Sequence, residues 1–472
     1  MAAMCRRGDV LRRAAGVAIL LALLFFSPVA SSTASATGIR GRIRNVPLHT
    51  AQRSSAVARR AGSVCTEGTF DALAVRWRQT GPGLVRVRVK VGDEAGPWDE
   101  RHRLHVHPDE GPDAGTREVR RHLRTSDLLW TGAAHCAEAN VVPPRGVAIS
   151  HVRLVLIDGS GEGSAQPSGR RSVGVDRPAI VTRARWGANE SLRNCPPSYA
   201  RRLKAGFVHH TAGSNDYGRW ESDDIVRAIY AFHTRVRHWC DIGYNFLVDR
   251  YGRVFEGRRG GVWRDVVPAA QQGFNRGAFA AAVMGNFEHA RPPRAARKAL
   301  KRLLAWRLDV AHLPADGRTS MVSTGGPHTR YPTGTEVRLR VINPHRRTGL
   351  TACPGDRLAR LMRYIRASAA RIGGPKILRP RRTPFAFVPG LEPVLIRARS
   401  EHTLDWTVTI SRDDQVVKKL GERGTLLRLR WWGNDGAGKP VDPGRYSVRI
   451  EGVTGDGRAA RPARLRLRAE RA

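Results

Sequence analysis

The sequence has few long apolar runs, few acidic residues and few lysines, and each shortage narrows the classes of protein it can belong to. The longest unbroken apolar stretch, Ala14–Phe26, has 13 residues, fewer than the roughly twenty that a membrane-spanning helix needs. No other segment is apolar enough to span a membrane. The 472-residue chain also carries 81 basic against 41 acidic residues, a formal net charge of +40, and only eight of the basic residues are lysine.

An excess of arginine is typical of proteins that bind the phosphates of nucleic acids, so a nucleic-acid partner has to be considered. The arginines are spread along the chain and alternate with apolar residues in strand-like runs such as "VRVRVKV" at 85–91. The aromatic residues interleaved with basic ones that would stack on bases are missing. We therefore interpret the arginines as solvated faces and expect no specific nucleic acid. Anionic wall polymers and lipid headgroups are the polyanions that an exported protein meets first.

The N-terminus has the pattern of a signal peptide. Arg12 and Arg13 precede the apolar stretch, and Ala34-Ser35-Ala36 follows it as a small-residue cleavage site. The pattern predicts a signal peptide over residues 1–36. We expect a secreted protein, extracellular or associated with the cell wall, with no transmembrane segment after cleavage.

Export places the six cysteines in an oxidising compartment, where pairing is favoured. Cys5 leaves with the signal peptide, and two pairs remain within separate regions of the chain. The expected pairs are Cys65 with Cys136 and Cys195 with Cys240. Cys353 has no partner left. An unpaired extracellular thiol is a liability unless something holds it as a thiolate, and a bound metal does so.

Changes in sequence pattern divide the mature chain into several parts, as its length also predicts. Residues 37–158 alternate apolar and polar positions in runs such as "ALAVRWRQ" and "VAISHVRLVLID", and predict a β-rich domain. Residues 159–177 are rich in Gly, Ser and Arg and are interpreted as a linker. Residues 178–373 alternate strand-like and helix-like patterns and predict an α/β domain. From 380 to 472 the strand pattern returns, as in "DWTVTISRD", and predicts an immunoglobulin-like β-sandwich module.

The central region carries the most specific pattern. "AGFVHHTA" (205–212) predicts a buried strand, and "YNFLVDRYGRVFEG" predicts two short strands around a turn. A helix with Ser222 as its N-cap is expected next to them, a second helix is expected to follow the proline pair in "PPRAARK", and a last one should cover 357–372. The predicted fold is a mixed β-sheet flanked by helices, placed between two all-β modules.

Three side chains of this region form a set that suits zinc. His209 ends the predicted buried strand, and His345 and Cys353 flank one loop. Two imidazoles and a thiolate leave one tetrahedral position open, as catalytic zinc sites do. A histidine such as His209 is by itself more often a satisfied core residue, and it is the combination with Cys353 that favours a metal site.

Four ordered motifs resemble one known family. They are "VHHTAGSNDY", "WCDIGYNFLVDRYGRVFEGR", "GFNRGAFAAAVMGNF" and "HRRTGLTACPGD". At these separations they resemble the peptidoglycan recognition proteins and type-2 N-acetylmuramoyl-L-alanine amidases. The resemblance covers about 195 of the residues, and it implies a zinc-dependent enzyme that hydrolyses the amide between N-acetylmuramic acid and L-alanine in peptidoglycan.

The resemblance also assigns residues. It implies that the zinc ligands are His209, in preference to its neighbour, together with His345 and Cys353. It implies catalytic roles for Tyr244 and Thr351, which are expected to stabilise the oxyanion or move a proton, and to orient the reacting groups. Packing beside the strand and shaping of the loop are the alternative roles of these two residues. Muramyl peptides are the implied partners, and His233 and Asn245 are expected to contact them.

Two departures from the family pattern bear on activity. Pro344-His345-Arg346-Arg347 stands where the family usually has Gly-His-Arg-Asp, and Pro268-Ala269-Ala270 stands where it usually has Gly-Ala-His. Both leave the predicted zinc ligands in place. The alternative to an enzyme is a recognition protein that binds peptidoglycan without cutting it. In such relatives the zinc cysteine is typically replaced, whereas this chain has Cys353.

Overall fold

The computed structural model describes residues 43–50, 60–92, 102–106, 111–118, 123–161, 168–170 and 174–471. The predicted signal peptide, residues 1–36, lies outside these ranges. The described chain is mostly β, with three larger sheets, one two-stranded sheet and a small set of helices.

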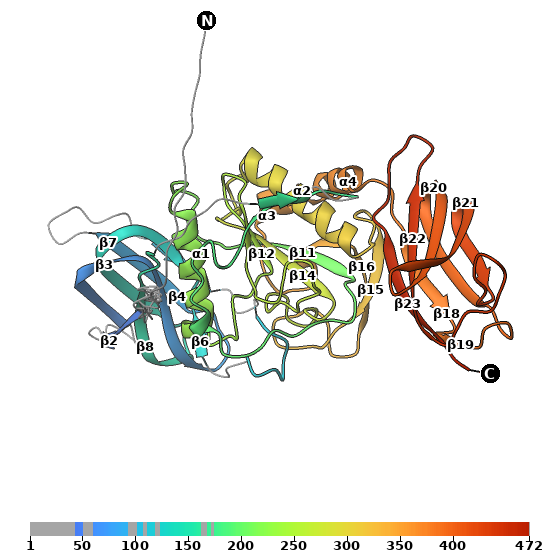
Figure 1. The fold of residues 1–472 in the computed structure, drawn as a ribbon. Coiled ribbons are helices and arrows are strands. Elements are labelled where there is room, and N and C mark those ends of the chain that lie inside the picture. The colour runs from blue at the N-terminus through green and yellow to red at the C-terminus, as the bar shows by residue number, and fades with distance from the viewer. Residues whose placement is uncertain are drawn as a thin grey trace, which may run out of the picture. The chain divides into compact units, whose positions relative to one another are not determined.

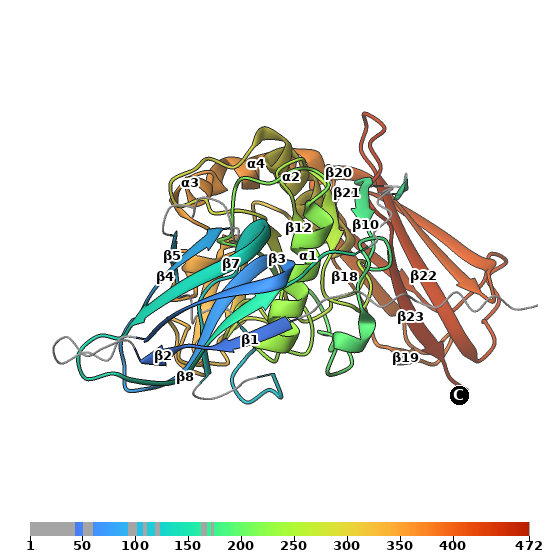
Figure 2. The same cartoon turned by 90° about the vertical axis from the view of Figure 1, so that its left-hand side faces the viewer.

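The first sheet is antiparallel and is built from residues 43–157 (Figure 2). Its strands are β1 (Ile43–Pro47), β2 (His49–Thr50), β3 (Arg60–Thr80), β4 (Arg86–Gly92), β5 (His102–Leu104), β6 (Leu123–Thr125), β7 (Leu129–Val142) and β8 (Ala148–Ile157). The long strand β3 pairs with β7 along one edge and with β8 along the other. Cys65 on β3 lies directly opposite Cys136 on β7, and the two form the predicted disulfide.

The second sheet is mixed and has the order β17-β11-β14-β12-β13-β10-β9. Its strands are β9 (Ser168–Arg170), β10 (Arg177–Val181), β11 (Ala205–His210), β12 (Phe246–Val248), β13 (Val254–Glu256), β14 (Ala278–Val283) and β17 (Ile342–Pro344). Strand β11 lies next to the edge strand β17 and runs parallel to it on one side and to β14 on the other. All six of its residues are buried, as the continuous apolar run predicted.

Helices cover both faces of the mixed sheet, as predicted (Figure 1). The helices are α1 (Ser222–Ala231), α2 (Arg294–Val310), α3 (Asp356–Ala359) and α4 (Met362–Gly373). One face packs with α1 in a core that includes Leu247 and Phe255, and the other packs with α2 and α4 in a core that includes Phe246 and Val248. Because side chains of a strand alternate between the faces, neighbouring residues fill opposite cores.

Two helix ends differ from the sequence expectations. Ser222 is the first residue of α1 and not its N-cap; Glu221 is the cap, and its carboxylate accepts from the Gly218 amide and the Trp130 indole instead of from the helix. The last predicted helix is broken into α3 and α4 around Arg360 and Leu361. The C-terminal end of α1 continues as a π-helical turn, Phe232–Val236.

The remaining strands complete the fold. A two-stranded sheet pairs β15 (Arg318–Val322) with β16 (Glu336–Arg340). The last sheet has the order β18-β20-β22-β23-β19, with β21 paired to β20. Its strands are β18 (Leu378–Thr383), β19 (Ala386–Phe387), β20 (Val394–Arg412), β21 (Gln415–Trp431), β22 (Gly444–Val453) and β23 (Ala463–Ala469). The runs "VLIRARS" and "DWTVTISRD", expected as two strands, form the single strand β20. Among the described residues no helix is long and apolar enough to cross a membrane.

Candidate metal centre

Strand β11 separates its two histidines by its alternation. His209 and His210 are consecutive, so they point to opposite faces of the sheet. His210 turns toward the segment that follows β14, and its Nδ1 accepts from the Phe287 amide at 3.2 Å. His209 points the other way, and its Nδ1 lies 3.8 Å from Cys353 Sγ. The fold therefore places His209, the residue preferred from the sequence, beside the cysteine.

His345 reaches the same place from the neighbouring strand. It opens a 3-10 turn, His345–Arg347, directly after β17, which runs parallel to β11. The carboxyl ends of parallel strands meet at one edge of a sheet. The rings of His209 and His345 consequently lie with their centroids 4.5 Å apart.

Cys353 is held by backbone contacts on both sides. Its amide donates to Thr351 Oγ1 at 3.0 Å, and its carbonyl accepts from the Arg346 amide at 2.9 Å. The His210 amide donates to its sulfur at 3.4 Å. Donation of an N–H to sulfur favours the thiolate, which is the form that binds a metal.

The three side chains fit a zinc ion. One nitrogen of each imidazole and the sulfur all lie within 4.8 Å of one another. Ligand atoms at the usual Zn–N and Zn–S distances of about 2.0 and 2.3 Å around one ion are roughly 3.3–3.6 Å apart, and the 3.8 Å between His209 Nδ1 and Cys353 Sγ is close to this. Burial lowers the pKa of His209 to about 3, with a smaller effect from His210, so the imidazole is neutral, as a ligand must be. The two histidines are 0% exposed and Cys353 is 2% exposed.

Tyr244 and His233 lie next to the three ligands. The Tyr244 ring centroid is 5.5 Å from that of His209 and 5.6 Å from that of His233. His233, on the π-helical turn after α1, accepts from the Gly243 amide through Nδ1 at 3.1 Å. Because Nδ1 is an acceptor, the neutral ring carries its proton on Nε2. Burial, and then Arg237 and Arg258, lower the pKa of His233 well below its usual value.

The other two predicted site residues are partly engaged in holding the fold. Thr351 accepts from the Cys353 amide and so shapes the loop that carries the ligand. Asn245 bridges two segments: its Oδ1 accepts from the Ala280 amide at 2.8 Å and its Nδ2 donates to the Val266 carbonyl at 2.9 Å. Its contact with substrate stays a prediction.

Two residues near the centre were not singled out from the sequence. Trp239 stacks on the His233 ring, with centroids 4.5 Å apart. Gln271 donates to the His345 carbonyl at 3.4 Å and to the Thr348 hydroxyl, and so holds the loop that carries His345. Trp239 precedes Cys240 within one of the four motifs, and this position could have identified it as a residue near the site. Gln271 follows residues 268–270, where the sequence departs from the family pattern, so the pattern gave no indication of its role.

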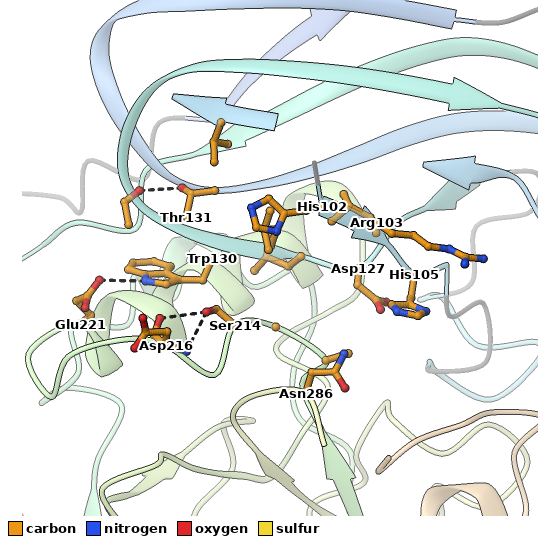
Figure 3. A pocket seen from close by; sticks show the side chains of 17 residues that line it. His102, Arg103, His105, Asp127, Trp130, Thr131, Ser214, Asp216, Glu221 and Asn286 are labelled. Atoms are coloured by element: carbon orange, nitrogen blue, oxygen red, sulfur yellow. Dashed lines mark hydrogen bonds between the residues drawn. The ribbon is translucent and has the colours of Figure 1, made fainter. Parts of the chain in front are cut away.

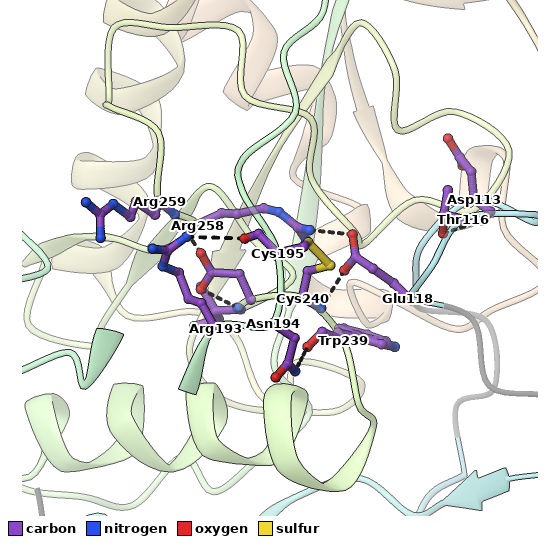
Figure 4. The surroundings of a disulfide bond; sticks show 12 residues. Asp113, Thr116, Glu118, Arg193, Asn194, Cys195, Trp239, Cys240, Arg258 and Arg259 are labelled. Carbon is purple, nitrogen blue, oxygen red and sulfur yellow. Dashed lines mark hydrogen bonds and ion pairs between the residues drawn. A yellow bond between two sulfur atoms is a disulfide. The ribbon is translucent and has the colours of Figure 1, made fainter. Parts of the chain in front are cut away.

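The second predicted disulfide, Cys195–Cys240, is also present (Figure 4). It ties the chain before β11 to the segment that follows His233. The Asn194 amide donates to the Cys240 carbonyl at 3.0 Å. The bridge therefore fixes the segment that carries Trp239 beside the candidate metal centre.

A cavity opens at the carboxyl ends of β11 and β14 (Figure 3). Its volume is about 460 Å³, and the first sheet contributes one wall through His102, Arg103, His105 and Asp127. Ser214 and Asn286, from the loops after β11 and β14, form part of the opposite wall. A second cavity of about 520 Å³ is lined by Arg103 and His105 on one side and by Thr351 on the other. Residues of the first sheet thus lie close to the loops that build the centre.

Comparisons with known proteins point to one family. A family model described as N-acetylmuramoyl-L-alanine amidase matches residues 199–356. Peptidoglycan recognition protein 1 of Bos taurus is 34% identical over 161 residues, which cover 34% of this chain and 76% of that protein. The N-acetylmuramoyl-L-alanine amidase of Homo sapiens is 30% identical over 196 residues, covering 39% of this chain and 28% of that protein.

A solved structure is similar over the same part. The crystal structure of human PGRP-IBETAC in complex with glycosamyl muramyl pentapeptide has 28% sequence identity and a TM-score of 0.31. The match covers 39% of this chain and 95% of that one.

Proposed function

Because the chain belongs to the family of peptidoglycan recognition proteins and type-2 N-acetylmuramoyl-L-alanine amidases, we propose that it is a zinc-dependent amidase acting on peptidoglycan. The observation that carries the proposal is the convergence of His209, His345 and Cys353 at one buried point. A recognition protein needs only a groove. Two buried histidines and a cysteine whose sulfur accepts from a backbone amide are a ligand set of the kind that catalytic zinc sites use, with one position left open.

The substrate proposed is the amide that joins the lactyl group of N-acetylmuramic acid to the L-alanine of the stem peptide. Hydrolysis adds one water across the C–N bond and leaves a carboxylate on the sugar and a free amine on L-alanine. His209, His345 and Cys353 would hold a zinc ion, which would supply a Lewis acid for the carbonyl and would lower the pKa of a bound water to about 7.

The chain's own groups complete the reaction. The Tyr244 hydroxyl donates a hydrogen bond to the oxygen on which negative charge develops. His233, neutral and protonated on Nε2, offers a second donor to the substrate from the same wall. Thr351 holds the Cys353 loop in position and orients the reacting groups, and Asn245 ties β14 to the segment at Val266 while it contacts the substrate.

The proposal extends to location and architecture. We infer export through the signal peptide at 1–36, and a secreted or wall-associated protein with muramyl peptides as partners and anionic wall polymers as a further class. The β-rich part (37–158) and the immunoglobulin-like part (380–472) are proposed as modules on either side of the amidase part at 178–373, with 159–177 joining the first two. The first and last sheets lie within residues 43–157 and 378–469, which supports the two outer parts, whereas β9 (Ser168–Arg170), inside the predicted linker, pairs with β10 in the mixed sheet.

Replacement of Tyr244 by phenylalanine tests the enzymatic role. The metal ligands stay, so zinc content should not change, whereas loss of one oxyanion donor should slow stem-peptide release by about a hundredfold. Tyr364→Phe, at an exposed position on α4, is the matched control and should release peptide at the normal rate. Mass analysis of fragments released from purified peptidoglycan measures the rate. If the unaltered protein binds peptidoglycan and releases no peptide with a free L-alanine amine, the chain is a recognition protein.

A further inference from the structure

Residues Gly111–Glu118, here called the strap, leave the first sheet and dock on the wall of the metal centre. At one end the Asp113 carboxylate accepts from the Gly273 amide at 2.8 Å and from Asn275 Nδ2 at 2.8 Å. The carbonyl of Gly111 also accepts from Asn275, at 3.1 Å. Asp113 is therefore held by donors that lie about 160 residues away in the chain, in a notch formed by Gly273 and Asn275.

The other end of the strap is held in the same way. Glu118 accepts from the Cys240 amide at 3.0 Å and from Arg258 at 2.5 Å (Figure 4). Between the two acidic anchors the turn Ala114–Arg117 is exposed. The strap is thus held by the carboxylates of Asp113 and Glu118 and by the buried backbone of Gly111 and Pro112, whose carbonyls accept from Asn275 and Gln272. Its exposed middle has no apolar side chain other than Ala114.

The strap lies on the side of the groove that the reaction uses. A Cβ added at Gly111 would be 3.3 Å from the Trp239 ring, so the strap backbone packs directly on this indole. Trp239 stacks on His233, and His233 neighbours Tyr244. Only one layer of side chains therefore separates the strap from the residues proposed to meet the substrate.

The notch is suited to a carboxylate in general. A backbone amide and a side-chain amide both donate to one oxygen of Asp113 and bind charge without a competing counter-ion. Asn275 is fixed for this task, because its Oδ1 accepts from the Ala270 and Gln271 amides and so directs its Nδ2 outward. Burial raises the pKa of Asp113, and the bonds from Asn275 and Gly273 lower it by less. Docking of the Asp113 carboxylate therefore carries a desolvation cost that its hydrogen bonds offset in part.

We propose that the strap is an internal occupant of the substrate groove, in which Asp113 fills a notch that a carboxylate of the stem peptide takes once the strap leaves. This rests on the proposed function, since it assumes that muramyl peptides bind beside the metal centre. The fraction of molecules whose strap is undocked then limits apparent affinity. The first sheet acts as a regulator of access in addition to its structural role.

Binding to the full mature chain tests the proposal. The probes are a synthetic muramyl tripeptide with a free C-terminal carboxylate and the same compound as its carboxamide, titrated in a Tyr244→Phe background that slows hydrolysis. Asp113→Ala should tighten binding of the carboxylate probe by about tenfold, because the competitor is removed. The carboxamide should bind the Asp113→Ala variant about tenfold more weakly than the carboxylate does. Arg117→Ala, exposed in the same turn, is the matched control and should bind as the parent does.

Hydrogen exchange on the parent protein gives a second test that needs no substitution in the strap. Adding the carboxylate probe should speed exchange of the amides at 111–118, while the Gly273 amide stays protected because it passes from Asp113 to the ligand. The proposal would be overturned if the parent and Asp113→Ala bound the carboxylate probe with equal affinity, or if the carboxylate and carboxamide probes bound equally well. It would also be overturned if the exchange of the strap amides did not change when the probe saturates the protein, or if either protein failed to bind the probes.

These readouts separate the strap from the enzymatic proposal. If the protein shows the expected changes in affinity and in amide exchange but never releases stem peptide, the strap competes with ligand as proposed and the protein is not an amidase. A protein that releases stem peptide rapidly while its strap amides stay protected is an amidase whose strap is purely structural.

Discussion

The first and last sheets are both antiparallel, yet they meet the rest of the chain through different chemistry. The first sheet shares one apolar core with the mixed sheet and helix α1. Side chains from both sides fill this core: Ala72, Ala74, Trp130, Val155 and Ile157 from the first sheet, and Ile225, Val226, Ile229 and Tyr230 from α1. The last sheet instead encloses a core of its own, built only from residues 377–469.

The last sheet meets the mixed sheet's helices through buried charge. Asp309 on α2 is 1% exposed and accepts from the Val175 amide, from Lys376 and from Arg461 of the last part of the chain. A buried ion network of this kind adds little net stability, because desolvation offsets the attraction. Burial of apolar surface contributes directly to folding. The first sheet therefore shares its core with the mixed sheet, and we expect the two to fold together, whereas we expect the last sheet, which has a core of its own, to be separable from them.

Deleting each sheet gives the largest contrast. A chain lacking residues 37–158 should fail to give soluble, cooperatively folding protein, because the apolar face of α1 would be left in water. A chain lacking residues 380–472 should stay folded, with a melting temperature lowered by only a few degrees. Size-exclusion chromatography and thermal melts would measure this. Soluble, active protein from the first deletion would show that the shared core is dispensable.

Single substitutions of two tryptophans compare the first and last sheets in the same way. Trp130 lies in the shared core, and Trp406 lies in the core of the last sheet. Each change to alanine should cost about 3–5 kcal/mol in the unfolding free energy of the unit that contains it. Trp130→Ala should therefore lower the temperature at which amidase activity is lost, while Trp406→Ala should leave that temperature unchanged. Equal effects of the two variants on the loss of activity would mean that the sheets unfold as one unit.

A third contrast depends on pH and comes from a buried acid at the joint of the first sheet. Asp71 on β3 accepts from the Gly159 amide through both oxygens, at 2.8 and 2.9 Å. Burial raises its pKa to about 8. The folded state then holds a proton that the unfolded state releases near pH 4, so stability is lost as the pH rises from about 4 to about 8, by at most about 1.4 kcal/mol per pH unit.

Asp71→Asn should remove this slope and leave the Gly159 bond in place, since an amide oxygen also accepts. Urea unfolding of both proteins at pH 5, 6, 7 and 8 makes the comparison. Parallel stability curves for the two proteins would refute the raised pKa.

The metal centre could be predicted because its residues stand at the ends of recognisable elements. The buried run at 205–210 predicted the strand β11, and the loop from His345 to Cys353 follows the strand β17. Parallel pairing of these two strands brings the three side chains together. The orphan Cys353 followed from counting the cysteines. The two disulfides were predicted on the same basis and are confirmed.

The strap and the shared core could not be predicted. "GPDAGTRE" has the composition of an ordinary loop, and the partners of Asp113 are far away in the chain. The alternation in β3 indicates that one face is buried but does not say against what. The predicted linker likewise holds Gly159, whose carbonyl accepts from Arg227 on α1. Long-range packing of this kind leaves no periodic signal in a single sequence.

The most direct test of the central claim measures zinc and stem-peptide release together in the metal-replete full chain. The parent protein should carry one zinc and release stem peptides that begin with a free L-alanine amine. Cys353→Ala should lose the zinc and release while still binding peptidoglycan, and Arg347→Ala, exposed in the same loop, should keep both. Undiminished release by Cys353→Ala, or a parent protein that carries zinc and releases nothing, would contradict the account.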